Sequence, residues 1–594
     1  MAEHLPRAAR EPKFSPAMRS ILPRPSALAQ SLGIAFAVLF ALNALLSLYV
    51  WAPEGAAWRL IVPVVETLAA LWLVLVVGRI GSRPRRRLGL LLSGAVVGIL
   101  SGFSAAEAFF RYFFARSFAP RTDIGMIRGG LLLLLGDIGP LADVLTPITI
   151  VAIFALLVAA GWGITTGVGA ALNRCRAPAA ALAVLTVVAL PAMLAVGLPP
   201  SLARITTVAW FEDDRLELVD LELARSPAED RPGGEAGAAT GGVAAGGVAE
   251  PVETYAFPGI ADRDIYIFAV EAYGYATVAR PELAAQVEPY RDRLRDAFAS
   301  QGYGVRTGYL RSPVAGGYSW LAEATLLTGQ WIDSQEKFAQ LYDLRPPSLP
   351  RMLHEGGYYT FTVRPGTVHG SWPEGWELYR FEEAIVAHDG DFGYVGPWFS
   401  YVPVTDQYAI WSAHRRIREL TGYGGATQSR PLLAHYQHVS SHTTFNRIPP
   451  VIRPWEDLGD GEVYNERSDE IELFDNTWTG GTELEEGYVA SIAYVFTVLT
   501  DYVGSVMDHS RDPVIVVMGD HQPQRPIRSP RAALSVPVHI ASRDPGVLRL
   551  FEERGYEHGM TSDEPPPHPP MSSFFPMFAE IAATERVEDA GIVR

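Results

Sequence analysis

The sequence predicts a multi-span α-helical membrane domain followed by an α/β domain whose largely parallel central sheet is flanked by helices. Long apolar runs fill the first 200 residues, whereas short apolar runs alternate with amphipathic segments after residue 252. Charge divides in the same way: the first 200 residues hold 17 Lys and Arg against 8 Asp and Glu, a balance of +9, so the other 394 carry −25 of the total −16. Because 594 residues exceed one ordinary domain, we predict a membrane domain (1–200), a connecting segment (201–251) and an extracytoplasmic domain (252–594).

Five apolar segments are long enough to cross a bilayer, which takes roughly 20 residues. They are 27–51, 60–77, 88–110, 144–167 and 179–198. Arginines crowd the N-terminus, the turn after the second segment and the turn after the fourth, and basic loops stay in the cytoplasm. We therefore expect a bacterial-type inner (cytoplasmic) membrane protein with a cytoplasmic N-terminus and everything after Leu198 outside, in the periplasm.

A second basic segment does not fit this pattern. The loop 111–130 contains four arginines and would lie outside. It is either an interfacial segment that touches anionic lipid headgroups or the ordinary scatter of short loops.

Charge and cysteine content exclude several classes of protein. The only cysteine, Cys175, falls in a predicted cytoplasmic turn, so the exported domain has no disulfide, no thiol nucleophile and no Cys-based metal site. A balance of −25 in that domain argues against a nucleic-acid partner and against tight adhesion of the domain itself to anionic lipid.

The exported part begins with a Gly- and Ala-rich stretch, 226–250, which is typical of a flexible tether. Strands then alternate with helices, and this alternation predicts a mainly parallel sheet between helical layers. The predicted strands are 264–274, 304–310, 358–363, 431–439 and 514–518, and the predicted helices are 287–300, 319–329, 348–355, 406–420, 488–509 and 574–583.

Polar side chains follow three of these strands: Glu271, His442 and the pair Asp520 and His521. Ligands of parallel sheets bind beyond the carboxyl ends of the strands, so these groups are candidates for one site. Ser319 opens a helix after two glycines in GGYSW, where the backbone can approach an anion. Carboxylates and an imidazole bind a divalent cation, which would activate the serine hydroxyl for attack on phosphorus.

Each of these residues also has a structural interpretation. Glu271 could be a capping or salt-bridged acid, Asp520 could cap the next helix, and His442 could be a structural histidine. Ser319 could be an N-cap, with Ser312 or Thr325 as competing nucleophiles. We favour structural roles for His435 and His438, which lie on one strand, and we expect His568, among prolines, to face solvent.

The pattern GDH after an apolar strand, together with SSHTTF at 440–445, resembles the alkaline phosphatase superfamily and its sulfatase-like branch, typified by lipoteichoic-acid synthase and the phosphoglycerol transferases. The resemblance implies an alkaline phosphatase-like domain. It also implies that Glu271, Ser319, Asp520 and His521 hold one divalent metal ion, with Mn²⁺ first and Zn²⁺ or Mg²⁺ as alternatives. Ser319 would be the nucleophile, and His442 would lie beside the leaving group as a catalytic and substrate-binding residue.

The sequence departs from this family at its substrate segment. Lipoteichoic-acid synthases carry Trp-x-Arg there, whereas this chain has SWPEGW, in which Trp372 keeps a substrate-binding place but Glu374 replaces the arginine. A carboxylate cannot donate a bidentate pair to phosphate. Arg364 or Arg380 could supply the positive charge from another position. The segment SWLAE also lacks the Cys/Ser-x-Pro-x-Arg pattern from which sulfatases make formylglycine, which argues against sulfate-ester hydrolysis.

These features predict a metal-dependent transferase that moves a phospho-substituent, first of all phosphoglycerol from a phospholipid headgroup, to an envelope glycan or related acceptor through a covalent serine intermediate. Alternatives within the superfamily are a phosphoethanolamine transferase, which the absence of cysteine disfavours, and a phosphodiesterase or phosphatase. An alternative of another class is a catalytically silent envelope sensor or scaffold.

Overall fold

The computed structural model divides the chain into two compact units, Met1–Asp213 and Asp214–Arg594. The residues it describes are 25–46, 65–114, 118, 123, 139–173, 178–180, 182–187, 257–260, 263–368, 372, 374–387, 390–421, 430–477, 480–529 and 532–584. The predicted tether, Cys175 and most of the basic loop lie outside these residues.

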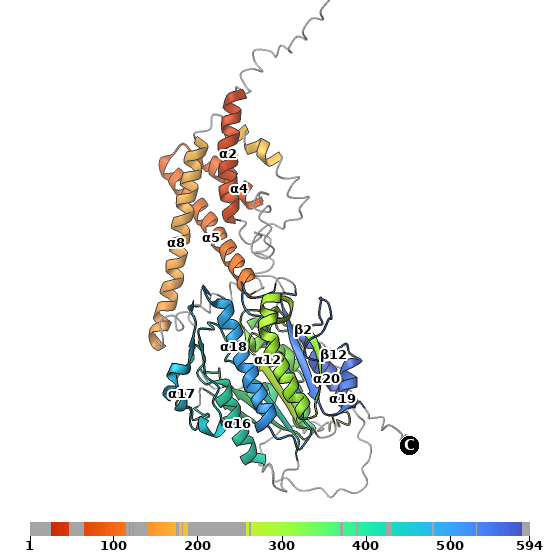
Figure 1. Cartoon of the computed structure of the whole chain (residues 1–594). Coiled ribbons are helices and arrows are strands. Elements are labelled where there is room, and N and C mark those ends of the chain that lie inside the picture. Colours follow the sequence, from red (N-terminus) through yellow and green to blue (C-terminus); the bar gives the residue numbers. More distant parts are fainter. Residues whose placement is uncertain are drawn as a thin grey trace, which may run out of the picture. The chain divides into compact units, whose positions relative to one another are not determined.

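The first unit is helical and apolar (Figure 1). Its described helices are α2 (Pro25–Leu46), α4 (Val65–Gly78), α5 (Arg83–Phe114), α8 (Gly139–Asn173) and a short helix at Pro178–Val187. Each overlaps one of the five predicted spans. Within α5 and α8, the stretches Arg83–Arg111 and Val144–Asn173 are long and apolar enough to cross a membrane. The apolar stretches described in the other three helices are shorter, and they are Leu32–Asn43, Thr67–Gly78 and Pro178–Val187. The chain is a multi-pass membrane protein.

Glycines bring the backbones of α5 and α8 into direct contact. A Cβ atom added at Gly98 would lie 1.9 Å from the carbonyl oxygen of Leu157, and one added at Gly161 would lie 1.9 Å from that of Gly94. Gly94 and Gly98 are four residues apart and therefore lie on one face of α5. This is the small-residue packing by which membrane helices approach closely.

The second unit is an α/β domain built on an eight-stranded sheet. The strand order is β12 (Glu557–His558), β2 (Gly304–Arg311), β11 (Ser535–Ser542), β10 (Val514–Gly519), β1 (Ile265–Val270), β5 (Leu432–Gln437), β3 (Tyr359–Arg364) and β4 (Glu383–Val386). Strands β11 and β12 run opposite to the other six. Two small two-stranded sheets, β6 (Arg447–Ile448) with β7 (Glu472–Leu473) and β8 (Asn476–Thr477) with β9 (Gly480–Gly481), lie outside it.

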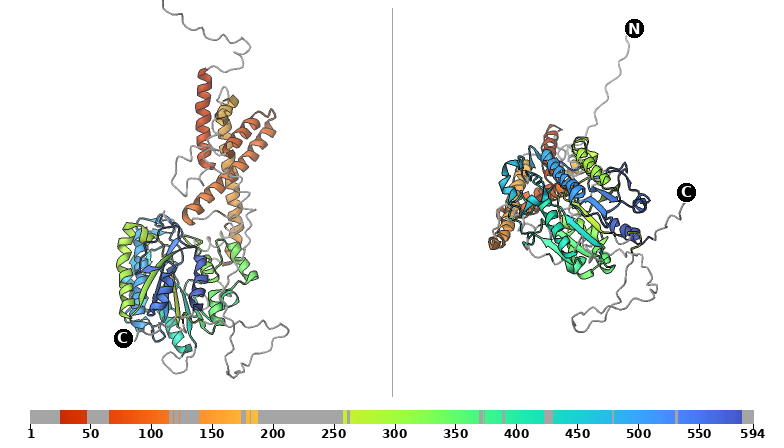
Figure 2. Two further views of the ribbon diagram at one scale, coloured as in Figure 1. Left: turned by 90° about the vertical axis from the view of Figure 1, so that its right-hand side faces the viewer. Right: turned by 60° about the horizontal axis from the view of Figure 1, so that its bottom comes forward.

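Helices cover both faces of the sheet (Figure 2). On one face, Tyr266 and Phe268 of β1 pack in a core with α12 (Pro281–Ser300), α16 (Asp406–Thr421) and α18 (Leu484–Asp501). On the other face, Ile265 and Ile267 pack with a second group of helices. That group is α13 (Ser319–Thr328), α14 (Gln335–Leu344), α15 (Leu349–Glu355), α19 (Pro545–Glu552) and α20 (Phe574–Ala583). The short helices α11 (Ala276–Ala279) and α17 (Val463–Glu466) connect the larger elements.

The predicted fold class is therefore confirmed: apolar helices precede an α/β domain with a mostly parallel sheet flanked by helices. The stretch Leu484–Val506 also has the length and hydropathy of a membrane span, but 56% of its apolar part is buried inside the protein. It comprises α18 and the π-helical turn η5 (Tyr502–Val506), and its side chains belong to the core of the α/β domain.

Candidate active site

The candidate site begins where two neighbouring parallel strands end. Val270 of β1 pairs with Gly519 of β10, so Glu271 and Asp520, the next residue of each strand, emerge side by side. Gly519 is needed at this point because a Cβ atom there would lie 1.8 Å from the carbonyl oxygen of Tyr273. The end of β10 therefore explains why an acid, Asp520, and an imidazole, His521, directly follow a buried strand.

A tight loop brings Ser319 to the same place. Gly316, Gly317 and Tyr318 all have positive φ angles, 73°, 135° and 67°, which glycine adopts easily and tyrosine adopts at some cost. The amide of Gly316 donates to the carbonyl oxygen of Gln522 over 2.7 Å, which ties this loop to the segment after β10. Ser319 is consequently held as the first residue of α13.

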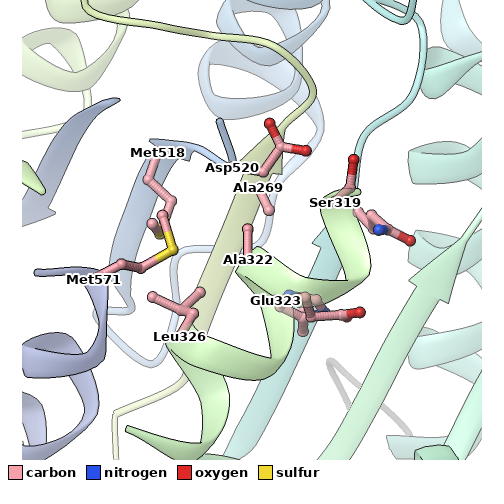
Figure 3. Close-up of a pocket in the computed structure, with 10 residues that line it drawn as sticks. Ala269, Ser319, Ala322, Glu323, Leu326, Met518, Asp520 and Met571 are labelled. Carbon is pink, nitrogen blue, oxygen red and sulfur yellow. The ribbon is translucent and has the colours of Figure 1, made fainter. Parts of the chain in front are cut away.

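Four side chains converge there. The Ser319 hydroxyl donates to Oε2 of Glu271 over 2.8 Å and lies 3.2 Å from Nε2 of His521. The same Nε2 lies 3.2 Å from Oε1 of Glu271 and 3.7 Å from Oδ2 of Asp520. Figure 3 shows Ser319 at the start of its helix beside Asp520, with the apolar side chains of Met518, Met571 and Leu326 lining the other side of a small pocket.

Neighbouring groups fix the orientation of these side chains. Oδ1 of Asp520 accepts the backbone N–H groups of Ala272, over 2.9 Å, and of His521, over 2.6 Å. Nδ1 of His521 lies 2.9 Å from the carbonyl oxygen of Gln522 and donates to it. The hydroxyl of Ser441 donates to the carbonyl oxygen of Glu271 over 2.6 Å, so the SSHTTF segment is attached to the first strand end.

The cluster fits a divalent cation. One ligand atom each from Glu271, Asp520 and His521 lies within 4.8 Å of the others, and all three side chains are buried. Oδ2 of Asp520 is buried without a hydrogen-bond partner among the described residues, which is costly unless something else satisfies it. Because Nδ1 of His521 donates to a carbonyl, Nε2 is the nitrogen left to bind an ion. Two carboxylates, one imidazole and an adjacent hydroxyl suit Mn²⁺, Zn²⁺ or Mg²⁺.

Electrostatics in the cluster reflect crowded buried charges. Burial and the neighbouring charge of Glu271 raise the pKa of Asp520 to about 7. Burial alone would raise the pKa of Glu271 as well, but the charge and hydrogen bond of His521 outweigh it and lower that pKa to about 2. Burial would lower the pKa of His521, yet the charges of Asp520 and Glu271 raise it to about 9. Without a cation, a proton on His521 thus balances the carboxylates.

A cavity of about 390 Å³ opens on Ser319 and Glu271. The predicted substrate residues His442 and Trp372 line it, together with several residues that the sequence had not singled out for the site. These include Tyr318, Trp320, Gln335, Phe338, Tyr401 and Gln437. The structure therefore brings all six predicted site residues, Glu271, Ser319, Trp372, His442, Asp520 and His521, to one cluster and its adjoining cavity.

His442 is positioned by contacts that no short motif revealed. Its ring stacks on Tyr401 with centroids 4.5 Å apart. The loop before it is ordered by Asp406, whose carboxylate accepts the N–H groups of Val439 and Ser440 over 2.8 and 3.0 Å. Asp406 is the first residue of α16, and in the sequence it looks like an ordinary helix-capping acid. Its hydrogen bond to the SSHTTF segment therefore could not be predicted.

Arg364, rather than Arg380, supplies positive charge to the cavity. Its guanidinium lies 3.8 Å from the centre of the Trp372 ring and forms a buried ion pair with Glu323. Arg380 instead lies over Trp376 at 4.8 Å, and Trp376 is half exposed. The half-buried Glu374 also lines the cavity, so this wall carries both signs of charge.

The alternative nucleophiles Ser312 and Thr325 do not line the cavity, whereas His438 does, and His435 lines the smaller pocket beside Ser319. Ser312 is fully buried, and the hydroxyl of Thr325 is bonded to the carbonyl oxygen of Leu321 within α13. His435 is buried beside Thr362 and Glu323, and its burial lowers its pKa to about 4. His438 is buried 3.2 Å from Oδ2 of Asp406. The prediction that His568 faces solvent is wrong: only 4% of it is exposed, because it packs between the rings of Tyr275 and Tyr309.

Comparison with known proteins finds similarity in solved structures only. No protein-family model and no curated protein matches the chain. The lipoteichoic acid synthase LtaP from Listeria monocytogenes is 18% identical, covers 48% of this chain and 66% of its own, and gives a TM-score of 0.33. A protein in the alkaline phosphatase superfamily from Vibrio parahaemolyticus is 13% identical over 49% of this chain and 63% of its own, with a TM-score of 0.33.

The lipooligosaccharide phosphoethanolamine transferase EptA from Neisseria meningitidis, an integral membrane protein, is 12% identical and covers 93% of this chain and 95% of its own, with a TM-score of 0.42. The chain thus spans slightly less than two thirds of the length of LtaP and of the Vibrio protein. These matches therefore include one member of the alkaline phosphatase superfamily and one lipoteichoic acid synthase, the two groups that the sequence resembles. At 12–18% identity and TM-scores below 0.5, they are similarities of fold and carry no conclusion about chemistry.

Proposed function

We propose that this protein is a metal-dependent transferase that moves a phospho-substituent from a phospholipid headgroup to an envelope glycan or related acceptor through a covalent intermediate on Ser319. The observation that carries the proposal is the hydrogen bond from the Ser319 hydroxyl to Glu271 inside the cluster with Asp520 and His521. A nucleophile, an acceptor for its proton and a set of cation ligands meet there, beside a cavity that can admit a substrate.

The cation would be held by Glu271, Asp520 and His521. When bound, it would lower the pKa of the Ser319 hydroxyl and offset the charge of the phosphoryl oxygens. The residues of the chain then have separate tasks. Glu271 orients the hydroxyl through its 2.8 Å hydrogen bond, and α13 presents the positive end of its dipole to the phosphoryl oxygens.

The first half of the reaction would exchange two bonds to phosphorus. A bond forms from Oγ of Ser319 to phosphorus as the hydroxyl proton passes to the Glu271 carboxylate, and the bond from phosphorus to the diacylglycerol oxygen breaks. The departing oxygen takes a proton, for which His442 at the cavity wall is the candidate donor. In the second half an acceptor hydroxyl displaces Oγ of Ser319 and gives up its proton to the same histidine, while Oγ takes its own proton back from Glu271.

The family resemblance favours phosphoglycerol as the transferred group. Trp372 and Arg364 form a cation–aromatic pair in the cavity wall, and we assign them to the substituent and its phosphate. Arg364 would then do from β3 what the arginine of Trp-x-Arg does in the family.

One observation favours a second donor, phosphoethanolamine. Glu374 places a carboxylate in the same cavity as the rings of Trp320, Phe338 and Trp372. A carboxylate beside aromatic faces attracts an ammonium group more strongly than neutral glycerol hydroxyls. Glu374→Arg should therefore shift the donor preference toward phosphatidylglycerol if the natural donor carries an amine.

The membrane domain supports a lipid donor, since it keeps the catalytic domain close to a bilayer. We place the N-terminus in the cytoplasm, the protein in the cytoplasmic membrane and the α/β domain in the periplasm, as the basic loops predict. A hydrolase differs only in using water as the final acceptor. A silent scaffold, in contrast, would need no stoichiometric cation.

Mass spectrometry of the full chain tests the proposal. Wild type and Ser319→Ala are incubated in detergent with Mn²⁺ and either phosphatidylglycerol or phosphatidylethanolamine. Wild type should release diacylglycerol and carry the phospho-substituent on the peptide that contains Ser319, and the mass added identifies the donor. Ser312→Ala is the matched control because its hydroxyl is buried away from the cavity.

Three results would contradict the proposal. They are the absence of both an adduct and diacylglycerol with either lipid, an adduct on another residue, or full activity of Ser319→Ala. A protein that binds no cation and behaves identically after Asp520→Ala would instead be a scaffold.

A further inference from the structure

The first unit contains a second cavity that the proposed chemistry does not use. It has a volume of about 320 Å³ and lies among α4, α5, α8 and the start of the next helix. Its walls are apolar over Val74, Leu75, Leu90 and Leu172. Two guanidinium groups, Arg79 and Arg86, line it together with the amide of Asn173.

These groups gather at one end of the helix bundle. Arg79 directly follows the end of α4, Arg86 lies in the first turn of α5, and Asn173 is the last residue of α8. This end includes the Arg-rich turn that the sequence assigns to the cytoplasm. The cavity thus has a charged end at the level of lipid headgroups and apolar walls toward the middle of the bundle.

The two arginines lack acidic neighbours in the helices around them. No Asp or Glu occurs at positions 67–106 or 144–211. The nearest acids in sequence, Glu66 and Glu107, are 13 and 21 residues away, which corresponds to about 20–30 Å along a helix. Glu107 is moreover paired with Arg111. The positive charge of the cavity is therefore not balanced by these helices.

A ligand for this cavity must be anionic at one end and apolar along its length. Guanidinium groups bind phosphate through parallel hydrogen bonds, and two of them can share one phosphodiester. Apolar walls next to such a pair suit the first methylenes of acyl chains. Basic pockets between membrane helices on the cytoplasmic side bind anionic headgroups in this way.

We propose that this cavity is a binding site for an anionic phospholipid, with Arg79 and Arg86 contacting the headgroup phosphate and Leu90 and Leu172 contacting the acyl chains. The site is separate from the Ser319 cavity and does not depend on the proposed transferase activity. Its occupant holds α4, α5 and α8 together at their arginine-rich end.

Lipid binding by the full chain in neutral detergent tests this site. Short-chain phosphatidylglycerol and phosphatidylcholine are titrated while retained lipid is counted by native mass spectrometry. The double variant Arg79→Gln/Arg86→Gln should bind phosphatidylglycerol at least about tenfold more weakly, a change of about 1.4 kcal/mol. Arg83→Gln/Arg87→Gln is the matched control, since it removes the same charge from the same turn at residues that do not line the cavity.

A second variant separates the cavity from its charge. Gly169 lines the cavity, and a Cβ atom there would come no closer than 3.6 Å to Val74. Gly169→Leu should therefore fill the space and weaken phosphatidylglycerol binding without altering charge. Any of four results would overturn the proposal. The two double arginine variants could lose the same affinity for phosphatidylglycerol, or wild type could bind phosphatidylcholine as tightly as phosphatidylglycerol. Gly169→Leu could bind phosphatidylglycerol as wild type does, or inorganic phosphate at the same concentration as the lipid could displace it.

Discussion

The hydroxyl of Ser319 donates a hydrogen bond over 2.8 Å to the carboxylate of Glu271, although 48 residues separate them in the chain. Glu271 directly follows β1 and Ser319 begins α13, so this contact requires the sheet, the glycine loop and the helix all to be in place. The N-cap position of α13 is Tyr318, so Ser319 is the first residue inside the helix, and its hydroxyl bonds to a side chain, whereas a capping serine bonds to a backbone amide. The contact therefore favours a nucleophile over a cap.

Asp520→Asn should separate cation binding from folding. Removing one of two adjacent buried carboxylate charges relieves repulsion, and Oδ1 can still accept its two backbone N–H groups. We expect the free energy of unfolding without cation to stay constant or rise by about 0.5–2 kcal/mol, while Mn²⁺ affinity falls at least about 10²-fold. Metal titration and chemical unfolding of the same preparations measure both quantities.

Asp512→Asn provides the matched control for this prediction. Asp512 precedes the same strand but its side chain is half exposed and paired with Arg543. Its substitution should alter neither Mn²⁺ affinity nor turnover. If Asp520→Asn bound Mn²⁺ as wild type does, the assigned ligand set would be wrong.

The buried pair Arg364 and Glu323 allows stability and activity to be distinguished. Arg364→Met leaves the Glu323 carboxylate buried without its main partner, which should cost about 3–5 kcal/mol of unfolding free energy. The double variant Arg364→Met/Glu323→Leu should regain most of that stability because no unpaired charge remains. If Arg364 contacts the substrate phosphate, turnover of the double variant stays low.

Recovery of both stability and turnover in the double variant would restrict Arg364 to a structural role. The measurements are urea unfolding and diacylglycerol release, compared with Arg380→Met. Arg380 is the appropriate comparison because it also lies over a tryptophan, but over one that is half exposed.

The sequence predicted much of this site because strand ends and short motifs are local features. Glu271, Asp520 and His521 directly follow apolar strands, and adjacent strands of a parallel sheet must end together. The boundaries of α20 and of the strand ending at Gly519 also agree with prediction, since apolar runs bounded by turn residues define them.

What the sequence did not predict depends on contacts between distant segments. Strand β11 runs antiparallel between β10 and β2, and nothing in its own residues specifies that neighbour. The stacking of Tyr401 on His442 and of Arg364 on Trp372 joins segments that are 41 and 8 residues apart without helical or strand spacing. His568 looks solvated among prolines, yet two tyrosines enclose it.

The crossing of α5 and α8 should be intolerant of side chains at its closest point. Gly98→Val would place a branched side chain against the Leu157 carbonyl, so we expect at least about 2 kcal/mol of destabilisation. Thermal unfolding of the full chain in detergent measures the change. Gly163→Val on α8 is the control, because a Cβ atom there meets nothing within 4 Å; equal effects of the two variants would argue against close backbone packing.

Acid should destabilise the α/β domain partly through His539. Burial, reinforced by the charge of Arg291, lowers the pKa of this histidine to about 3, and both ring nitrogens contact hydroxyls, those of Tyr273 and Thr307. The unfolded chain takes up the proton near pH 6.5, about three pH units before the folded domain does. Stability is therefore complete above about pH 6.5 and falls as the pH drops toward 3, by up to about 1.4 kcal/mol per pH unit from this residue.

His539→Gln removes this titration while retaining hydrogen-bonding groups. Between pH 6 and pH 4.5, its unfolding free energy should fall less steeply than that of wild type, by about 1 kcal/mol per pH unit. Urea unfolding followed by near-ultraviolet circular dichroism at several pH values gives the two slopes. His558→Gln, at an imidazole whose side chain is 77% exposed, should leave the slope of wild type unchanged. Identical slopes for wild type and His539→Gln would contradict the prediction. They would mean that His539 already carries its extra proton in the folded domain at these pH values.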